Sequence, residues 1–345
     1  MAASDPRPRR ALRLACGTAL ALAAGYGLGV PLPFLAALLT ANLLALRSQA
    51  LPLKAALALP LLVMLTTSLG LLLIPMLQHT PLSGLLLIAL CLFHCFRFTL
   101  RGGNALLGTF VVIGLTMITS AGTASFDLAL TVIEALAKAL LLAVLAAILA
   151  HALFPEPADA SAPPAPAQES PLDANWIALR ATLVVLPALL LALIDPSRYL
   201  ALILKSVALG QQVCSHETRN AGRELVGSTL LGGGLALLLW SLLTLQPSLL
   251  MYCLWLLLFS LLLARRLFRL APSRASPGFW LNTLATLILL LGQSVEDSQT
   301  GKDVYTAFAV RLALFIGVAL YAWLAVHLID RWRGRRQTRP QSAQD

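Results

Sequence analysis

Long, unbroken apolar stretches constrain this chain more than any other feature. Each is continuously apolar and lacks the two-residue alternation of a barrel strand, so a lipid environment favours helices. A helical span needs about 20 residues, and the candidate stretches are residues 11–30, 32–46, 55–77, 82–98, 104–122, 126–153, 175–194, 197–213, 225–245, 248–264, 279–297 and 303–327. The sequence therefore predicts an all-α membrane protein with about twelve transmembrane helices.

The composition leaves no room for a large soluble domain. Of the 345 residues, 59% are hydrophobic and 12% are charged. Twelve spans use about 240 residues, which excludes a built-in nucleotide-hydrolysing module. The Gly301-Lys302 pair also lacks the other residues of a P-loop. Because there is no nucleophile elbow, metal-ligand set or paired-carboxylate site, we expect neither an enzyme nor a bound metal or cofactor.

Basic residues are concentrated on one side of the predicted bundle. The net charge is +10, and with twelve alternating spans only Arg198 and Lys302 of the 25 basic residues fall on the other side. The positive-inside rule then places both termini in the cytoplasm. The basic tail, residues 329–345, lies on the same side and would attract anionic lipids of the bilayer. Topology accounts for the charge, so we expect no nucleic-acid binding.

A proline- and alanine-rich segment divides the chain into two similar halves. Residues 154–174 are predicted to be a cytoplasmic linker between a first membrane repeat, residues 1–153, and a second, residues 175–328. Both repeats open with an arginine, Arg13 or Arg180, followed by a proline-containing turn and Phe-Leu-Ala or Tyr-Leu-Ala. With six spans each, the repeats share one orientation. This layout predicts a pathway between two parallel six-helix repeats.

Two cations inside predicted spans are candidates for substrate binding. An ionisable residue in a span costs about 3 kcal/mol or more unless it faces the bundle interior or a wet cavity. Lys205 and Arg311 have no opposite charge within one helical turn. Such cations suit an anionic ligand, most simply a carboxylate, to which Ser206 and Asn42 would add hydrogen bonds. The open alternative is a structural ion pair with Asp127, Asp195 or each other.

Glu134 and Lys138 form a second charged group within a predicted span. They lie four residues apart on one helix face, so they would neutralise each other in the simplest interpretation. The functional alternative assigns Lys138 to substrate binding. Glu134, as the one carboxylate predicted to be buried, would then be the proton-coupling residue.

The segment CSHETRNAGRELVGSTLLGGGLALLL, residues 214–239, is the most distinctive in the chain. It joins a charged loop to a glycine-rich helix in which small residues allow close helix packing. Together with ALRLACG near the start and RLALFIGVALYAWLAVHL near the end, it resembles the fusaric acid resistance (FUSC-like) and aromatic acid exporter group of inner-membrane proteins. Without the resemblance, positive-inside arginines and packing glycines explain the segment equally well.

The resemblance implies a bacterial inner-membrane exporter of aromatic or related organic acids that works with a periplasmic adaptor of the membrane-fusion type. It also assigns family-motif positions to Arg219, Arg223, Gly227, Thr229 and Gly232. Many members of the group carry a large cytoplasmic domain, whereas this chain has only the short linker. Regulation or coupling attributed to that domain therefore does not transfer.

The sequence thus favours a secondary exporter of organic anions, with aromatic carboxylic acids as substrates and proton coupling as the energy source. A passive anion channel would use the same buried cations, and a non-transporting membrane scaffold or subunit of an envelope complex is a further alternative. Whether the chain forms a homo-oligomer is left open.

Overall fold

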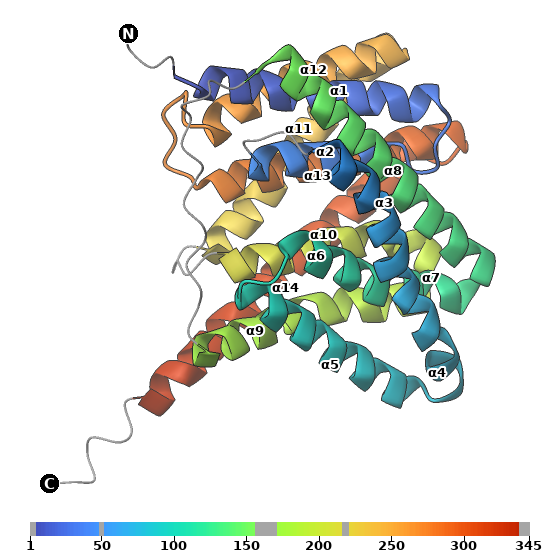
Figure 1. The fold of residues 1–345 in the computed structure, drawn as a ribbon, viewed down its shortest axis with the longest axis vertical. Helices are drawn as coiled ribbons and strands as arrows, with labels where there is room; N and C mark the ends of the chain where they lie inside the picture. The colour runs from blue at the N-terminus through green and yellow to red at the C-terminus, as the bar shows by residue number, and fades with distance from the viewer. Residues whose placement is uncertain (1–4, 48–51, 156–170, 216–220, 338–345) are drawn as a thin grey trace, which may run out of the picture.

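The structure, a computed structural model, describes residues 5–47, 52–155, 171–215 and 221–337, and all regular structure within them is helical (Figure 1). A 3-10 turn (Leu69–Leu73) joins α3 to α4, and a π-helical turn (Gly114–Ile118) joins α6 to α7. The helices are α1 (Arg7–Gly27), α2 (Phe34–Leu46), α3 (Leu53–Ser68), α4 (Ile74–His79), α5 (Pro81–Leu100), α6 (Ala105–Ile113), α7 (Thr119–Ala124), α8 (Phe126–Leu153), α9 (Pro171–Ile194), α10 (Pro196–Ser215), α11 (Ala221–Leu245), α12 (Leu249–Leu267), α13 (Pro277–Gln299) and α14 (Val304–Gln337).

Several helices begin where a short polar residue follows a turn. The side chains of Asn104, Ser125, Ser248 and Ser276 accept hydrogen bonds from backbone N–H groups in the first turns of α6, α8, α12 and α13. These bonds satisfy donors that a helix leaves open at its start. The caps therefore fix the residues at which these four helices begin.

Nine helical segments in the described residues are long and apolar enough to cross a membrane, which supports a multi-pass membrane protein. They are Ala58–His79, Pro81–Leu100, Ala105–Ala124, Phe126–Leu153, Asp173–Ile194, Arg223–Leu245, Leu249–Leu267, Pro277–Gln299 and Val304–Leu328. Phe34–Leu46 and Tyr199–Gln211 are shorter apolar helices, and α1 belongs to neither group. Its four arginines lower its hydropathy. The count of twelve spans and the two-repeat layout therefore stay predictions.

Two helices extend beyond the predicted limits of the second membrane repeat. α9 begins at Pro171, ahead of residue 175 where the second repeat is predicted to begin, and α14 continues to Gln337, well into the predicted tail. Residues 156–170 of the predicted linker lie outside the described residues. α1 begins and α14 ends on the same side of the bundle, at the left of Figure 1.

Helices before and after the linker pack against each other in corresponding pairs. α1 packs against α12, and α9 packs against α5. In the same way α2 packs against α13, and α10 packs against α6 and α7. These contacts place α10 and α13 at the boundary between residues 5–155 and residues 171–337.

Glycine permits the closest backbone contact in the N-terminal half. A Cβ on Gly114 would lie 2.7 Å from Cα of Thr67, and a Cβ on Gly70 would collide with the carbonyl group of Gly114. Only a residue without a side chain allows two helices to approach this closely. The 3-10 and π-helical turns meet at this crossing, so the helices depart from α-geometry where they are nearest.

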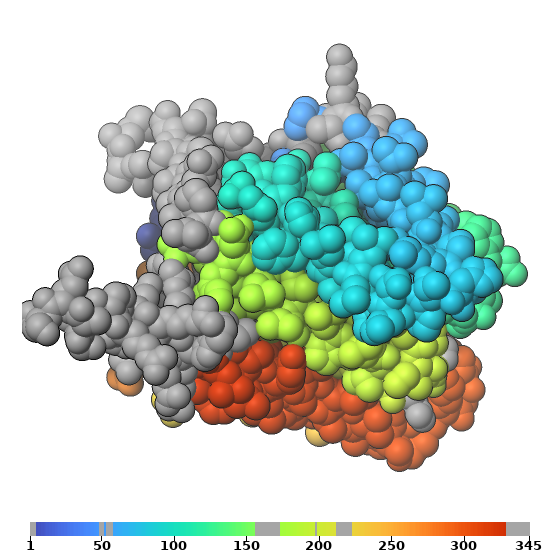
Figure 2. Space-filling model, turned by 90° about the horizontal axis from the view of Figure 1, so that it is seen from below, coloured from blue at the N-terminus to red at the C-terminus, as the bar shows by residue number. Residues whose placement is uncertain are grey.

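The outer surface of the bundle is apolar. Figure 2 shows α5, α9 and α14 side by side on one face. Their exposed residues include Leu82, Leu86, Leu190 and Leu324. Exposed leucines in such number suit lipid rather than water, in agreement with the membrane class.

Candidate functional site

Lys205 lies in a polar cluster between α10, α13 and α14. Its side chain is fully buried, with 0% exposed area. Nζ donates hydrogen bonds to Oδ1 of Asn282 at 2.9 Å and to Oγ1 of Thr286 at 2.6 Å. The ring centroid of Phe315 on α14 lies 6.0 Å from Nζ. The lysine is therefore surrounded by neutral groups from two neighbouring helices.

The ammonium group of Lys205 has no carboxylate partner among the described residues. No other ionisable group there interacts electrostatically with it, and the ion pairs found in that part of the chain involve other cations. An ammonium group has three N–H donors, of which Asn282 and Thr286 occupy two. One N–H donor of the ammonium group therefore has no hydrogen-bond partner among the described residues.

α11 supports this cluster from behind. Oγ of Ser228 accepts a hydrogen bond from Nδ2 of Asn282 at 2.6 Å. One turn further along α11, Gly232 lies directly against α13, where it faces Thr283 and Thr286. The helix thus touches both residues that bind Lys205.

A third contact fixes the start of α13. The carboxylate of Glu224 accepts hydrogen bonds from the backbone N–H and the hydroxyl of Ser276, the residue that caps α13. Positions 224, 228 and 232 are four residues apart and so share one helix face. The glycine-rich segment singled out in the sequence therefore contributes the face of α11 that packs against α13 beside Lys205.

Replacing Gly232 by alanine should loosen this packing. The new Cβ would lie 2.7 Å both from the carbonyl oxygen of Thr283 and from Cβ of Thr286, and such overpacking costs about 1–3 kcal/mol. We expect a lower Tm in a thermal unfolding scan in detergent. Gly234 on the same helix is the control, because a Cβ there meets nothing within 4 Å. Equal losses of Tm in both variants would contradict the close α11–α13 contact.

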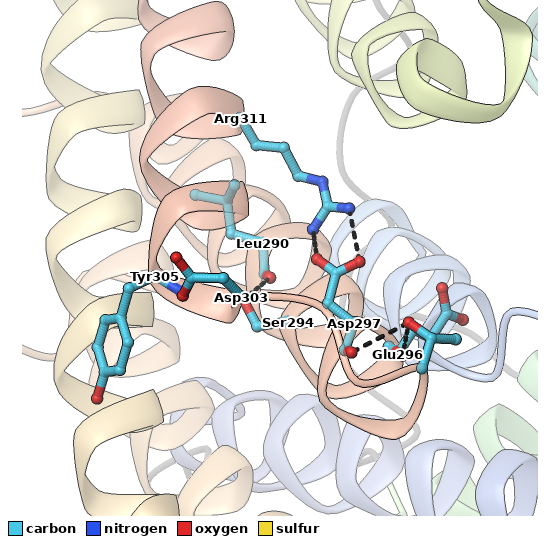
Figure 3. Close-up of polar contacts among 8 residues, drawn as sticks. Leu290, Ser294, Glu296, Asp297, Asp303, Tyr305 and Arg311 are labelled. Carbon is cyan, nitrogen blue, oxygen red and sulfur yellow. Dashed lines mark hydrogen bonds and ion pairs between the residues drawn. The ribbon is translucent and has the colours of Figure 1, made fainter.

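Arg311 lies one turn from Phe315 on α14 and pairs with Asp297 in the last turns of α13. Both terminal nitrogens contact the carboxylate, and Nη2 lies 3.1 Å from Oδ1 (Figure 3). The side chain of Asp297 is 5% exposed and that of Arg311 is 21% exposed. The structure thus brings Arg311 to an acidic partner other than Asp127 and Asp195, the two that the sequence suggested. The pair joins two helices that are consecutive in the chain.

Asp303 sets the start of α14 and hence the position of Arg311. Its carboxylate accepts a hydrogen bond from the hydroxyl of Thr306. It accepts a second, at 3.2 Å, from the backbone N–H of Tyr305, which lies beside it in Figure 3. The bond from Thr306 holds the pKa of Asp303 below its usual value. Asp303 therefore stays ionised and suits the positive start of the helix.

Glu134 and Lys138 differ from the expectation of a buried position. They form an ion pair on α8, with side chains 57% and 50% exposed. The packed face of α8 consists of residues such as Val132, Leu136 and Leu140, and the charged pair points to the opposite side. The expectation that Glu134 is the one buried carboxylate is wrong, because Asp297 is buried and Glu134 is not.

The side chains of Ser206 and Asn42 form hydrogen bonds that do not involve Lys205. The hydroxyl of Ser206 donates to the carbonyl of Ile203 at 2.9 Å, and Nδ2 of Asn42 donates to the carbonyl of Leu38 at 2.9 Å. Both side chains bond their own helix. These hydrogen bonds therefore do not support a role for Ser206 or Asn42 beside Lys205.

The family-motif positions have separate environments. Arg219 lies outside the described residues, and Arg223 is exposed. Thr229 is buried and donates to the carbonyl of Leu225, while a Cβ on Gly227 would lie 3.3 Å from the ring of Phe279. Gly227, Thr229 and Gly232 thus serve helix packing, and Gly232 alone touches the Lys205 cluster.

Comparison with known proteins finds a match to a family without an established function, and it lies in the N-terminal half. A family model described as "Protein of unknown function (DUF2955)" matches residues 10–150, from α1 into α8. No curated protein and no solved structure matches the chain. The match ends before α10 begins, so Lys205 and its partners lie outside it.

Sequence analysis missed the neutral partners of Lys205 and the acidic partner of Arg311. Asn282 and Thr286 are single polar residues in an apolar helix, and nothing local in the sequence distinguishes them from threonines that bond their own backbone. The pairing of Asp297 with Arg311, by contrast, could have been predicted from their positions in the sequence. Asp297 precedes a short turn, and Arg311 follows that turn by two helical turns, so an antiparallel hairpin brings them together.

Proposed function

We propose that this protein is a membrane transporter that exports organic anions, with Lys205 as the anion-binding group. The observation that carries the proposal is a fully buried lysine whose hydrogen-bond partners are neutral. A buried charge costs several kcal/mol unless it is paired, and a hydrophobic residue would be cheaper. A ligand of opposite charge explains why a cation is kept there.

Aromatic carboxylates are the proposed substrates. The carboxylate would accept the third N–H of Lys205 in a charge-assisted hydrogen bond, the strongest kind available to it. Phe315 supplies an apolar ring beside the ammonium group, against which a substrate ring can stack. Arg311 is less suited to binding in this arrangement because both of its terminal nitrogens contact Asp297. The resemblance to the aromatic acid exporters points to the same substrate class.

The proposed pathway runs between two six-helix repeats of a twelve-span protein. Corresponding contacts, α1 with α12 and α5 with α9, support the repeat layout. α10, which carries Lys205, packs against α6 and α7 of the other half. In a transporter built from repeats, substrates bind where the repeats meet. We place the protein in a bacterial inner membrane with both termini in the cytoplasm, as the loop charges predict.

An aspartate at position 282 tests the anion site directly. Asn282→Asp would set a carboxylate of almost the same shape against Lys205, so that the protein neutralises its own cation. We expect uptake of labelled benzoate into proteoliposomes with an imposed pH gradient to fall by about tenfold or more, the loss of one charge-assisted hydrogen bond. Asn104→Asp is the control, because Asn104 is an exposed helix cap and aspartate caps equally well.

The same assay separates the alternatives. Accumulation of benzoate above its external concentration, driven by the pH gradient and beyond the level in protein-free liposomes, supports a coupled transporter. Flux that only dissipates a benzoate gradient indicates a passive channel and removes the coupling from the proposal. Wild-type transport by Asn282→Asp in folded protein would contradict the assignment of the anion site to Lys205.

A further inference from the structure

The hydrogen-bond chain behind Lys205 has a fixed direction. Oγ of Ser228 lies 3.1 Å from the carbonyl oxygen of Leu225, which can only accept, so the single hydroxyl hydrogen points there. Toward Asn282 the same oxygen must therefore accept. The group of Asn282 that faces Ser228 is then its NH2, at 2.6 Å, and its carbonyl oxygen faces Lys205.

The second partner of Lys205 is fixed in the same way. The hydroxyl of Thr286 lies 2.7 Å from the backbone carbonyl oxygen of Asn282 and donates its hydrogen to it. Oγ1 of Thr286 can therefore only accept from Nζ of Lys205, at 2.6 Å. Both partners therefore present lone pairs to Nζ of Lys205 and accept hydrogen bonds from it.

We infer that this chain makes the site selective for one monovalent carboxylate, with Ser228 as a positioning residue that acts through Asn282. The inference rests on the proposed function. Lys205 supplies one positive charge and one unoccupied N–H, and no other charged group of the described residues interacts with it. A monocarboxylate neutralises that charge. A dicarboxylate would bring a second negative charge into a fully buried site and leave it without a partner.

Competition in the wild-type protein tests the selectivity. Labelled benzoate transport is measured in proteoliposomes against unlabelled benzoate and against isophthalate, which keeps the ring and adds a second carboxylate. We expect isophthalate to compete at least about tenfold more weakly, as an uncompensated buried charge requires. Equal competition by both acids would overturn the selectivity claim. This arm needs no variant and so does not depend on a variant that folds.

A double-mutant cycle tests the positioning role. Without the hydroxyl of Ser228 the NH2 of Asn282 loses its acceptor and the amide oxygen is held less firmly against Lys205. Ser228→Ala should therefore raise the KM for benzoate by about tenfold with little change in kcat. In an Asn282→Ala background the same substitution should have no further effect, because Ser228 acts only through the amide. An equal effect of Ser228→Ala with and without Asn282 would overturn the role.

Two further variants distinguish a failure of this inference from a failure of the proposed function. Ser294 on α13 is also fully buried and bonds only the carbonyl of Leu290, so Ser294→Ala should leave KM unchanged. If Lys205→Met transports benzoate as the wild type does, the proposed function fails. If Lys205→Met is inactive but isophthalate competes fully or the cycle shows no coupling, only the present inference fails.

Discussion

Lys205→Met is expected to abolish benzoate transport and at the same time to stabilise the protein. Transport should fall on the order of 100-fold, the upper range for loss of a hydrogen bond to a charged group. Removal of a buried charge relieves a desolvation cost of several kcal/mol, whereas Oδ1 of Asn282, left without its donor, returns about 1–3 kcal/mol of it. The hydroxyl of Thr286 keeps its hydrogen bond to the backbone carbonyl of Asn282. We expect a net stabilisation and a Tm that rises by several degrees in detergent.

The opposite signs of the two effects distinguish a binding lysine from a structural one. A lysine that holds the fold together would lose both transport and stability when replaced. The control is the double variant Glu134→Gln with Lys138→Met, which removes a lysine and its partner from the exposed face of α8. This variant should retain transport. A lowered Tm for Lys205→Met would contradict the view that its charge is uncompensated.

Asp297→Asn is expected to destabilise the protein more than any other single change considered. The substitution keeps the shape of the side chain but leaves Arg311, one-fifth exposed, without its carboxylate. Breaking a buried ion pair from one side costs about 3–5 kcal/mol, and the partial exposure of Arg311 favours the lower end. The measurement is unfolding by thermal scan or denaturant titration in detergent.

The double variant Asp297→Asn with Arg311→Met shows whether the pair is structural. Removal of both charges should restore most of the stability, because neither member of the pair is then left without its partner. Benzoate transport should also return, since Lys205 is untouched. Recovery of stability without recovery of transport would instead assign Arg311 to the transport mechanism.

The helices of this protein are largely predictable from sequence because continuous hydropathy marks them directly. The predicted span 126–153 coincides with α8, and the predicted span 82–98 lies within α5. Lys205 was also predictable as a candidate, since a lone cation in an apolar helix carries a large insertion cost. These features depend on one segment at a time.

The features that sequence analysis missed depend on the rotation of helices and on pairs of helices. A charged pair four residues apart reads the same whether it faces the core or the outside, so the exposed position of Glu134 follows only from how α8 packs. Asn282 meets Lys205 across 77 residues of chain. Neither helix alone indicates that contact.

The central claim is that a buried, uncompensated Lys205 binds a carboxylate, and an experimental structure with 4-bromobenzoate tests it most directly. The bromine locates the ligand by anomalous scattering or strong density. We expect a carboxylate oxygen about 3 Å from Nζ of Lys205, with Asn282 and Thr286 still in contact. Lys205 bonded to a carboxylate of the protein itself, with the ligand bound elsewhere, would contradict it.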